Sequence, residues 1–150
     1  MKTKFEILKA TEPFHLLPDD ILQEVSELLT EIRFNTETLA YRQEITKMDG
    51  VDIIVKGEYE TFFFDTNDDK RSIEKHGPNY CFGGISLLVN RKQALKSVIA
   101  KKGTVIYKLP RKDFLHLSNA YEEFFQYYAN DFGKRMLDEE FEHFFKEPAE

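Results

Sequence analysis

The chain has 150 residues, of which 41% are hydrophobic and 32% are charged, and its formal net charge is −6 at pH 7. This length suits one domain with a hydrophobic core, and the composition is that of an ordinary globular protein. The acidic balance argues against general nucleic-acid binding, which needs a basic face, but it does not exclude a local basic pocket. No segment approaches the roughly 18 consecutive apolar residues of a membrane span, and the N-terminus has no signal-peptide core, so we expect a cytoplasmic protein without membrane partners.

The N-terminal part of the chain is predicted to be helical. Residues 1–16 are expected to form a short helix or arm whose apolar side chains dock on a core. Pro18 followed by Asp19 and Asp20 is typical of a helix start, because proline suits the first turn and acids stabilise the positive end of the helix dipole. Apolar side chains then recur at helical spacing as far as Leu29, which predicts a second helix.

From Thr30 to Pro110 the apolar residues recur with a period close to two, as is typical of β-strands. Glycines and polar residues interrupt this pattern and predict turns at residues 35–37, Gly57, residues 67–70 and Gly103. The predicted strands are TEIRFN (30–35), TLAYRQ (38–43), VDIIVKG (51–57), EYETFFFDT (58–66), RSIEKHG (71–77), SVIA (97–100) and TVIYKLP (104–110). Short strands with turn signals at such spacing indicate an antiparallel sandwich or roll.

After Pro110 the chain is predicted to be helical as far as about Lys146. The last helix is unusually aromatic, and one stripe of its side chains is expected to pack on the roll: Tyr121, Phe124, Phe125, Tyr128 and Phe132. Other aromatic residues lie off that stripe or beyond it: Tyr127, Phe141, Phe144 and Phe145. Because an apolar patch at the end of a helix usually has a cover, we expect a homodimer or a further domain to contact this helix.

The chemistry-bearing residues form no recognisable catalytic or metal-binding pattern. The four histidines are isolated, without the paired histidines that a cupin-type metal site needs. Neither a G-x-S-x-G nucleophile elbow nor a glycine–lysine phosphate loop occurs. Cys81 is the only cysteine and has no partner base beside it, so it is interpreted as a small buried apolar side chain in a reducing compartment. We expect neither an enzyme nor a cofactor.

The order of these elements, with the short glycine-opened segment FGGISLL (82–88) inside the roll, resembles the cyclic nucleotide-binding domain family. That family includes the effector domain of the catabolite activator protein and the regulatory subunits of protein kinase A. The resemblance rests on TEPFHLLPDDIL (11–22), VDIIVKGEYE (51–60), FGGISLL, SVIA and VIYKLPRKDFLHL (105–117). In detail the chain is similar to a module that opens certain bacterial signal-transduction proteins, which continue into CBS and nucleotidyltransferase-like domains.

The resemblance implies an α+β fold in a single domain spanning residues 1–150. N-terminal helices are expected within residues 1–29 and C-terminal helices within residues 111–146. Between them, residues 30–110 are expected to form an antiparallel β-roll, that is, a jelly roll or double-stranded β-helix, which contains a short cassette helix.

The family's phosphate-binding cassette reads F-G-E-L-A-L-L and, a few residues later, R-A/S-A-T-V-x-A. Backbone N–H groups and the arginine hold the cyclic phosphate, and the glutamate accepts a hydrogen bond from the ribose. Here Gly84 takes the place of the glutamate, Ala94 that of the arginine, and Leu95 that of the small residue beside it. The candidate ligand-binding residues are Phe82, Gly83, Gly84, Ile85, Ser86, Arg91, Ala94, Leu95 and Lys96.

The two missing side chains decide how well a nucleotide can bind. Each hydrogen bond to a charged group contributes about 1.5–3 kcal/mol, so their loss weakens affinity by roughly a hundred- to ten-thousandfold. Arg91, Lys92 and Lys96 lie close by and could supply a substitute cation. If Ala94 faces the cassette, strand alternation places Lys96 on the same face and Leu95 on the opposite one.

Two main hypotheses follow. In the first, the chain is a degenerate cyclic nucleotide-binding-like regulatory module that does not bind cAMP or cGMP tightly and acts through its C-terminal helix, in oligomerisation or domain coupling. In the second, it is a sensor that binds a cyclic nucleotide or another small anion at the cassette. A further alternative is the effector domain of a transcription regulator without its DNA-binding part.

Overall fold

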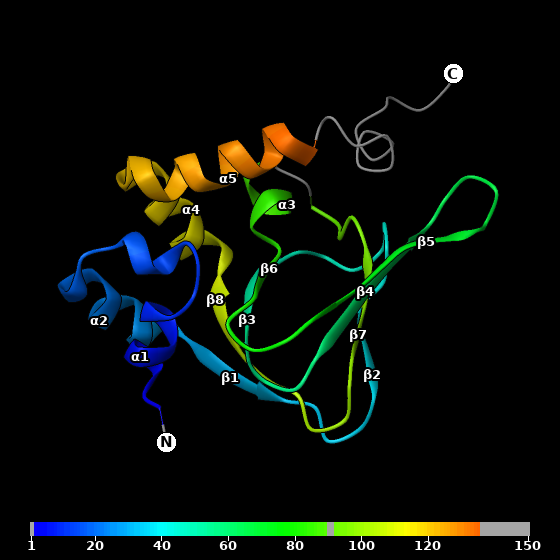
Figure 1. Ribbon diagram of the computed structural model, residues 1–150, viewed down its shortest axis with the longest axis horizontal. Coiled ribbons are helices and arrows are strands. Elements are labelled where there is room, and N and C mark those ends of the chain that lie inside the picture. Colours follow the sequence, from blue (N-terminus) through cyan, green and yellow to red (C-terminus); the bar gives the residue numbers. More distant parts are fainter. Residues whose placement is uncertain (1, 90–91, 136–150) are drawn as a thin grey trace.

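The computed structural model describes residues 2–89 and 92–135, in which helices gather at one end of a β-roll (Figure 1). The fold class predicted from the sequence, α+β with an antiparallel β-roll, is confirmed. The N-terminal helices are α1 (Lys4–Lys9), the 3₁₀ helix η1 (Phe14–Leu16) and α2 (Asp19–Leu28). The later helices are α3 (Gly84–Leu88), α4 (Arg111–Ala120) and α5 (Glu122–Arg135).

Two four-stranded antiparallel sheets make up the roll within the described residues. The first sheet has the order β1 (Thr30–Arg33), β8 (Val105–Pro110), β3 (Gly50–Lys56) and β6 (Cys81–Phe82). The second has the order β2 (Thr38–Tyr41), β7 (Ser97–Ala100), β4 (Tyr59–Phe64) and β5 (Lys70–His76). Because β1 pairs with β8 and β2 pairs with β7, the turn predicted at residues 35–37 carries the chain from one sheet to the other.

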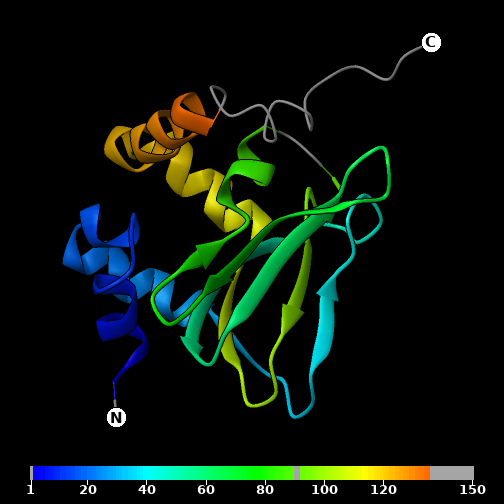
Figure 2. The ribbon, with the colours of Figure 1, turned by 45° about the vertical axis from the view of Figure 1, so that its right-hand side comes forward.

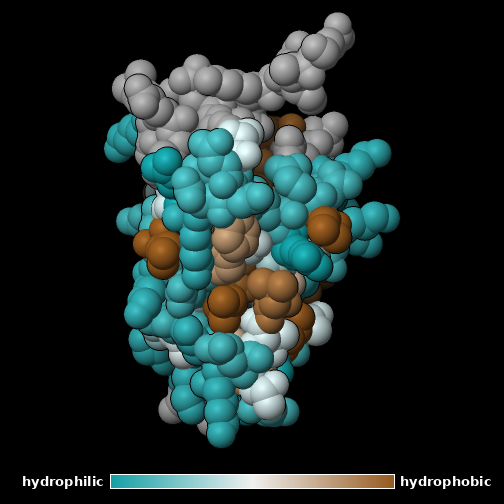
Figure 3. Space-filling model, turned by 90° about the vertical axis from the view of Figure 1, so that its right-hand side faces the viewer, coloured by the Kyte–Doolittle hydropathy of each residue, from teal (hydrophilic) through white to brown (hydrophobic). Residues whose placement is uncertain are grey.

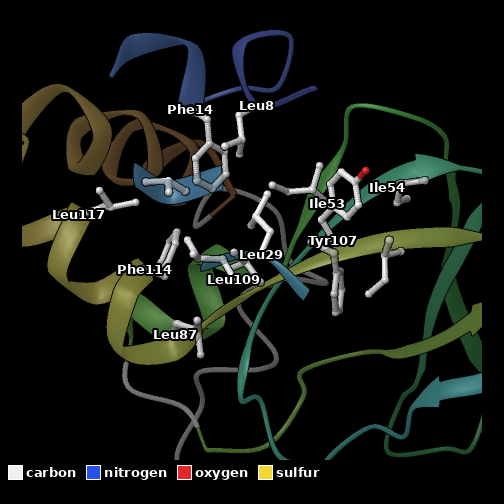
Figure 4. Packing of buried hydrophobic residues seen from close by; sticks show 14 of the residues in the cluster. Leu8, Phe14, Leu29, Ile53, Ile54, Leu87, Tyr107, Leu109, Phe114 and Leu117 are labelled. Atoms are coloured by element: carbon white, nitrogen blue, oxygen red, sulfur yellow. The ribbon is translucent and has the colours of Figure 1, made fainter. Parts of the chain in front are cut away.

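The helices pack on the first sheet. Contacts join α4 to β3 and α2 to β8, while Figure 2 shows the second sheet at the side of the roll away from the helices. Figure 4 shows the aliphatic and aromatic side chains that fill the space between helices and sheet, among them Leu8, Phe14, Leu109 and Phe114. Phe14 and Phe114 are both fully buried and meet the ring of Phe124 edge-on, at centroid distances of 5.3 and 5.6 Å. This contact joins the N-terminal and C-terminal helices into one layer.

The aromatic stripe predicted for the last helix is only partly correct. Phe124 and Tyr128 are buried, as expected, but Phe125 is 44% exposed. Phe125 is displaced by about 100° around the helix from Phe124, on the side away from the core. Tyr127 instead packs against the core, and its hydroxyl donates to Oε2 of Glu12 at 3.2 Å. The contact with the N-terminal segment therefore determines which side of α5 is covered. Phe141, Phe144 and Phe145, for which a covering partner was predicted, lie outside the described residues.

The outer face of the second sheet carries exposed apolar side chains. Figure 3 views the molecule from this side and shows some apolar residues adjoining one another and others standing apart, on a largely hydrophilic surface. Leu39 on β2, Phe64 on β4 and Ile73 on β5 are each about half exposed. Among residues 2–89 and 92–135, no helix is both long and apolar enough to cross a membrane.

Candidate functional site

The cassette begins where β6 turns into α3. Gly83 precedes α3 with φ of +104°, a left-handed conformation that glycine adopts without steric penalty. A Cβ atom at this position would lie 2.7 Å from Cε of Met48. The glycine is therefore required both by the backbone turn and by the close approach of Met48.

Gly84, which takes the place of the family's glutamate, lies directly under the ring of Tyr128 from α5. A Cβ atom at Gly84 would lie 2.5 Å from Cζ and 2.7 Å from the hydroxyl oxygen of Tyr128. The tyrosine is only 6% exposed, and its hydroxyl donates to Sγ of Cys81 at 3.8 Å. The space that a longer side chain at Gly84 would need is thus occupied by a residue 44 positions later in the sequence.

Cys81 is half-buried, in keeping with its interpretation as a packing residue rather than a nucleophile. Burial raises the pKa of its thiol to about 12, and the hydrogen bond from Tyr128 offsets this only in part. Near neutral pH the thiol is therefore protonated, whereas the reactive form of cysteine is the thiolate. Burial likewise raises the pKa of the Tyr128 hydroxyl well above its ordinary value.

The cassette encloses a cavity of about 80 Å³. Small-molecule sites usually offer roughly 300–1,000 Å³, so this cavity is much smaller than a site for a nucleotide. Its walls come from β4, β5, the β5–β6 connection, β6, α3, the segment before β7, and α5. The lining residues are Thr61, Glu74, His76, Tyr80, Cys81, Phe82, Gly83, Gly84, Ile85, Ser86, Leu95, Lys96, Tyr128 and Asp131.

Most residues singled out in the sequence come together around this cavity: Phe82, Gly83, Gly84, Ile85, Ser86, Leu95 and Lys96. Ala94 does not line it. Ala94 is fully buried in the main core, and its backbone N–H donates to the carbonyl oxygen of Thr46 at 2.8 Å. Arg91 lies outside the described residues.

The alternation expected for residues 94–96 is wrong, because β7 begins only at Ser97. Leu95 and Lys96 precede the strand, and both line the cavity. Leu95 is 6% exposed and packs with Phe63, Ile85 and Phe132. The residue that faces the cassette is therefore a leucine, where a bound phosphate would need a small or basic side chain.

Sequence reasoning missed the opposite wall of the cavity. Thr61 on β4 pairs in register with Glu74 on β5, and His76 lies two residues further along that strand. Nε2 of His76 lies 3.3 Å from Oε2 of Glu74, and its ring stacks on Tyr80 at a centroid distance of 3.8 Å. The i, i+2 spacing of Glu74 and His76 was the available signal, because alternate residues of a strand share a face.

The polar groups of the cavity are arranged unfavourably for an anion. Among the described residues, the lining has two carboxylates, those of Glu74 and Asp131, together with Lys96 and with His76, which lies 3.3 Å from Glu74. Thr61 is 2% exposed, and its hydroxyl oxygen has no hydrogen-bond partner among residues 2–89 and 92–135. In the part of the chain that the structure describes, no group of histidine, cysteine, aspartate and glutamate side chains is arranged to hold a metal ion.

Residues 31–121, more than half of the chain, match the family described as the cyclic nucleotide-binding domain. The chain therefore belongs to the cyclic nucleotide-binding domain family, as its cassette and roll predict. This is a family of regulatory domains. Among curated proteins, none matches the chain.

Solved structures share the fold. The sensor domain of the transcriptional regulator DNR from Pseudomonas aeruginosa superposes with a TM-score of 0.75 at 12% identity, covering 89% of this chain and 90% of that one. For the catabolite activator protein of Thermus thermophilus, the TM-score is 0.70 at 19% identity, and the match covers 86% of this chain and 60% of that one. A mutant regulatory subunit of a cAMP-independent protein kinase A from Trypanosoma brucei, bound to cAMP, superposes with a TM-score of 0.65 at 17% identity. This match covers 85% of this chain and 50% of that one. The chain thus spans only 60% and half of the last two proteins.

Proposed function

We propose that this chain is a regulatory domain whose cassette no longer binds cAMP or cGMP tightly and whose α5 helix transmits its state to a partner surface. The observation that carries the proposal is the packing of Tyr128 on Gly84. In the family cassette, the residue at that position is the acid that holds the ribose. Here its absence lets an aromatic ring from α5 close the site.

The rest of the cavity supports the same conclusion. A volume of about 80 Å³ has room for only about three water molecules, since each takes roughly 30 Å³. Leu95 covers the approach where a phosphate would lie, and the carboxylates of Glu74 and Asp131 repel an anion. A nucleotide would have to displace Tyr128. The cassette lacks the glutamate and arginine whose hydrogen bonds would compensate for this displacement.

The α5 helix is placed to act as the output element. It contacts α3 through Tyr128 and η1 through Phe124, and it reaches Glu12 through Tyr127. A shift of the cassette helix is therefore passed directly to α5, and from there to whatever follows residue 135. The domain would act in a homodimer or beside a further domain, in a role similar to that of the sensor domain of a transcriptional regulator.

A second candidate function is that of a working sensor, in which the cassette binds a cyclic nucleotide or another small anion. The observation that favours it is the buried hydroxyl of Thr61, which faces the cavity and has no hydrogen-bond partner. A ligand that accepts from Thr61 and from Lys96 would meet that need while moving Tyr128 aside.

Isothermal titration separates the two functions. The wild-type protein and Tyr128→Ala are titrated with cAMP, cGMP and inorganic phosphate up to millimolar concentration, with Phe125→Ala as the control on the exposed side of α5. We expect no saturable heat from the wild type or from the control, and weak nucleotide binding from Tyr128→Ala. Micromolar binding of a nucleotide or of phosphate to the wild type would overturn the proposal in favour of the sensor.

A further inference from the structure

A groove lies on the first sheet beside α1, away from the cassette. It has a volume of about 630 Å³ and lies where β1, β3 and β8 meet the turns at one end of the roll. Figures 1 and 2 both show two of these turns, at residues 35–37 and at Gly103, at the end of the roll opposite α5. None of the residues that line the groove also lines the cassette cavity.

The floor of the groove is apolar. Val105 and Tyr107 on β8 pair in register with Arg33 and Glu31 on β1, so the four side chains share one face of the sheet. Ile7 of α1 packs at one end of this floor, where it and Tyr107 are buried. Val105 is only partly buried. Beyond α1, the floor is therefore left uncovered by residues 2–89 and 92–135.

The rim of the groove is cationic. Among the described lining residues, the charged side chains are those of Lys2, Arg33, Lys56 and Glu31, and Glu31 pairs with Arg33 at 2.9 Å. Neither lysine has an ion-pair partner in the part of the chain that the structure describes. The lining thus has an excess of two positive charges, in a chain whose net charge is −6.

The segment that follows α5 in the sequence has the opposite charge and a high aromatic content. Residues 136–150 contain six carboxylates and one lysine, and three phenylalanines lie within FEHFF (141–145). Such a segment complements a groove with an apolar floor and a cationic rim. The carboxylates belong to Asp138, Glu139, Glu140, Glu142, Glu147 and Glu150.

We propose that residues 136–150 of one copy of this chain bind in the groove of a second copy, with phenylalanines on the floor and carboxylates at the rim. The inference rests on the proposed function, because it names the surface to which α5 transmits its state. A second copy is the occupant because α5 and the groove of one chain lie at opposite ends of the roll (Figure 2). Two copies related by a twofold axis exchange equivalent segments, so each dimer contains two such contacts.

Sedimentation velocity of the full chain tests this contact. We expect a dimer whose dissociation constant rises with NaCl concentration, because salt screens charges at the surface. A tail variant, Phe144→Ser combined with Phe145→Ser, should raise the dissociation constant at least about tenfold, because it removes two apolar side chains from the floor of the groove.

A groove variant reverses two exposed charges at the rim. Arg33→Glu combined with Lys56→Glu should raise the dissociation constant about ten- to a hundredfold. The matched control is Lys75→Glu combined with Lys112→Glu, two exposed lysines outside the groove. The control changes the net charge of the chain by the same amount and should raise the dissociation constant by less than about threefold. Circular dichroism verifies that each variant is folded.

A mixture of the tail variant and the groove variant gives the decisive measurement. Either variant alone forms a dimer in which both contacts are defective. In the mixture, the unchanged segment of the groove variant meets the unchanged groove of the tail variant, which restores one contact. We expect the mixture to dimerise at concentrations at which each variant alone is monomeric.

The proposal is overturned if the full chain is monomeric at every concentration, if the groove variant dissociates no more readily than its control, or if the mixture stays monomeric. Such a failure would leave the closed cassette standing, because Tyr128 packs on Gly84 within one chain. Failure of the proposed function would appear instead in the isothermal titration, as micromolar binding of a nucleotide or phosphate.

Discussion

The cassette and the surroundings of Asp52 inside the roll differ in whether a buried polar side chain is kept. At the cassette, the positions that hold a nucleotide in the family carry a glycine and apolar side chains, and Tyr128 fills the space. Between the sheets, Asp52 stands in a buried strand and is held by two tyrosine hydroxyls. The cassette lies where a helix can close over it, so lost polar groups are replaced by packing. Asp52 is buried in the roll, where its Oδ2 atom accepts hydrogen bonds from two tyrosines and its Oδ1 atom lies 3.6 Å from Nζ of Lys108.

The largest effect is expected from restoring the family's acid. Gly84→Glu places a side chain where the ring of Tyr128 lies, and we expect it to lower the free energy of unfolding by about 3 kcal/mol or more. Urea denaturation measures the change. The control is Gly133→Ala on α5, where no atom lies within 4 Å of an added Cβ; it should raise stability by about 0.5–1 kcal/mol.

A double variant tests the cause of this effect. If Tyr128 is the obstacle, Tyr128→Ala combined with Gly84→Glu should be more stable than the sum of the two single changes predicts. Wild-type stability of Gly84→Glu alone would mean that the ring moves aside readily. Packing of Tyr128 on Gly84 would then contribute little to the stability of the cassette.

An intermediate effect is expected from the interior network. Tyr59→Phe removes one hydrogen bond to the Asp52 carboxylate and should lower the free energy of unfolding by about 1.5–3 kcal/mol. Tyr107→Phe is the matched control, because Tyr107 is also buried and its hydroxyl makes no hydrogen bond that the structure records; it should change stability by less than about 0.5 kcal/mol. Equal losses in the two variants would show that the Asp52 network contributes little.

The smallest effect is a dependence on pH. Burial raises the pKa of Asp52 above its ordinary value of 3.8, and Lys108 and the two tyrosine hydroxyls act in the opposite direction without reversing it. The folded protein therefore holds this proton more tightly than the unfolded chain does. The resulting stabilisation is complete below pH 3.8 and is lost as the pH rises through the raised pKa.

Comparison with Asp52→Asn isolates this contribution. Stability of the wild type relative to that variant should fall with rising pH, by at most about 1.4 kcal/mol per pH unit. The half-buried Glu60 and Asp65 have lowered pKa values and act in the opposite direction, but they are present in both proteins and cancel. A difference between the two proteins that is independent of pH would contradict the raised pKa.

The sequence predicts the scaffold well because local signals mark it. Pro18, Gly57 and Gly103 stand at boundaries where the structure has a helix start or a turn, and period-two segments become strands. The departures from the family cassette at Gly84 and Leu95 were also readable in the sequence. What fills the cassette was not, because Tyr128 approaches Gly84 from a distant helix.

The placement of residues 94–96 and the partners of Asp52 depend on contacts between segments that are distant in the sequence. The alternation expected for residues 94–96 was wrong, because these residues precede β7, which begins at Ser97. A charged residue between Val51 and Ile53 signals a special position in a buried strand. Its partners Tyr41 and Tyr59 belong to the other sheet, so only the fold brings them together.

Phe82 lies between the cassette cavity and the tyrosines that hold Asp52. Its ring packs on Tyr41 and Tyr59, at centroid distances of 5.2 and 6.0 Å, and the same residue lines the cassette cavity. A displacement of this ring from the cassette side would therefore disturb the two tyrosines whose hydroxyls hold Asp52.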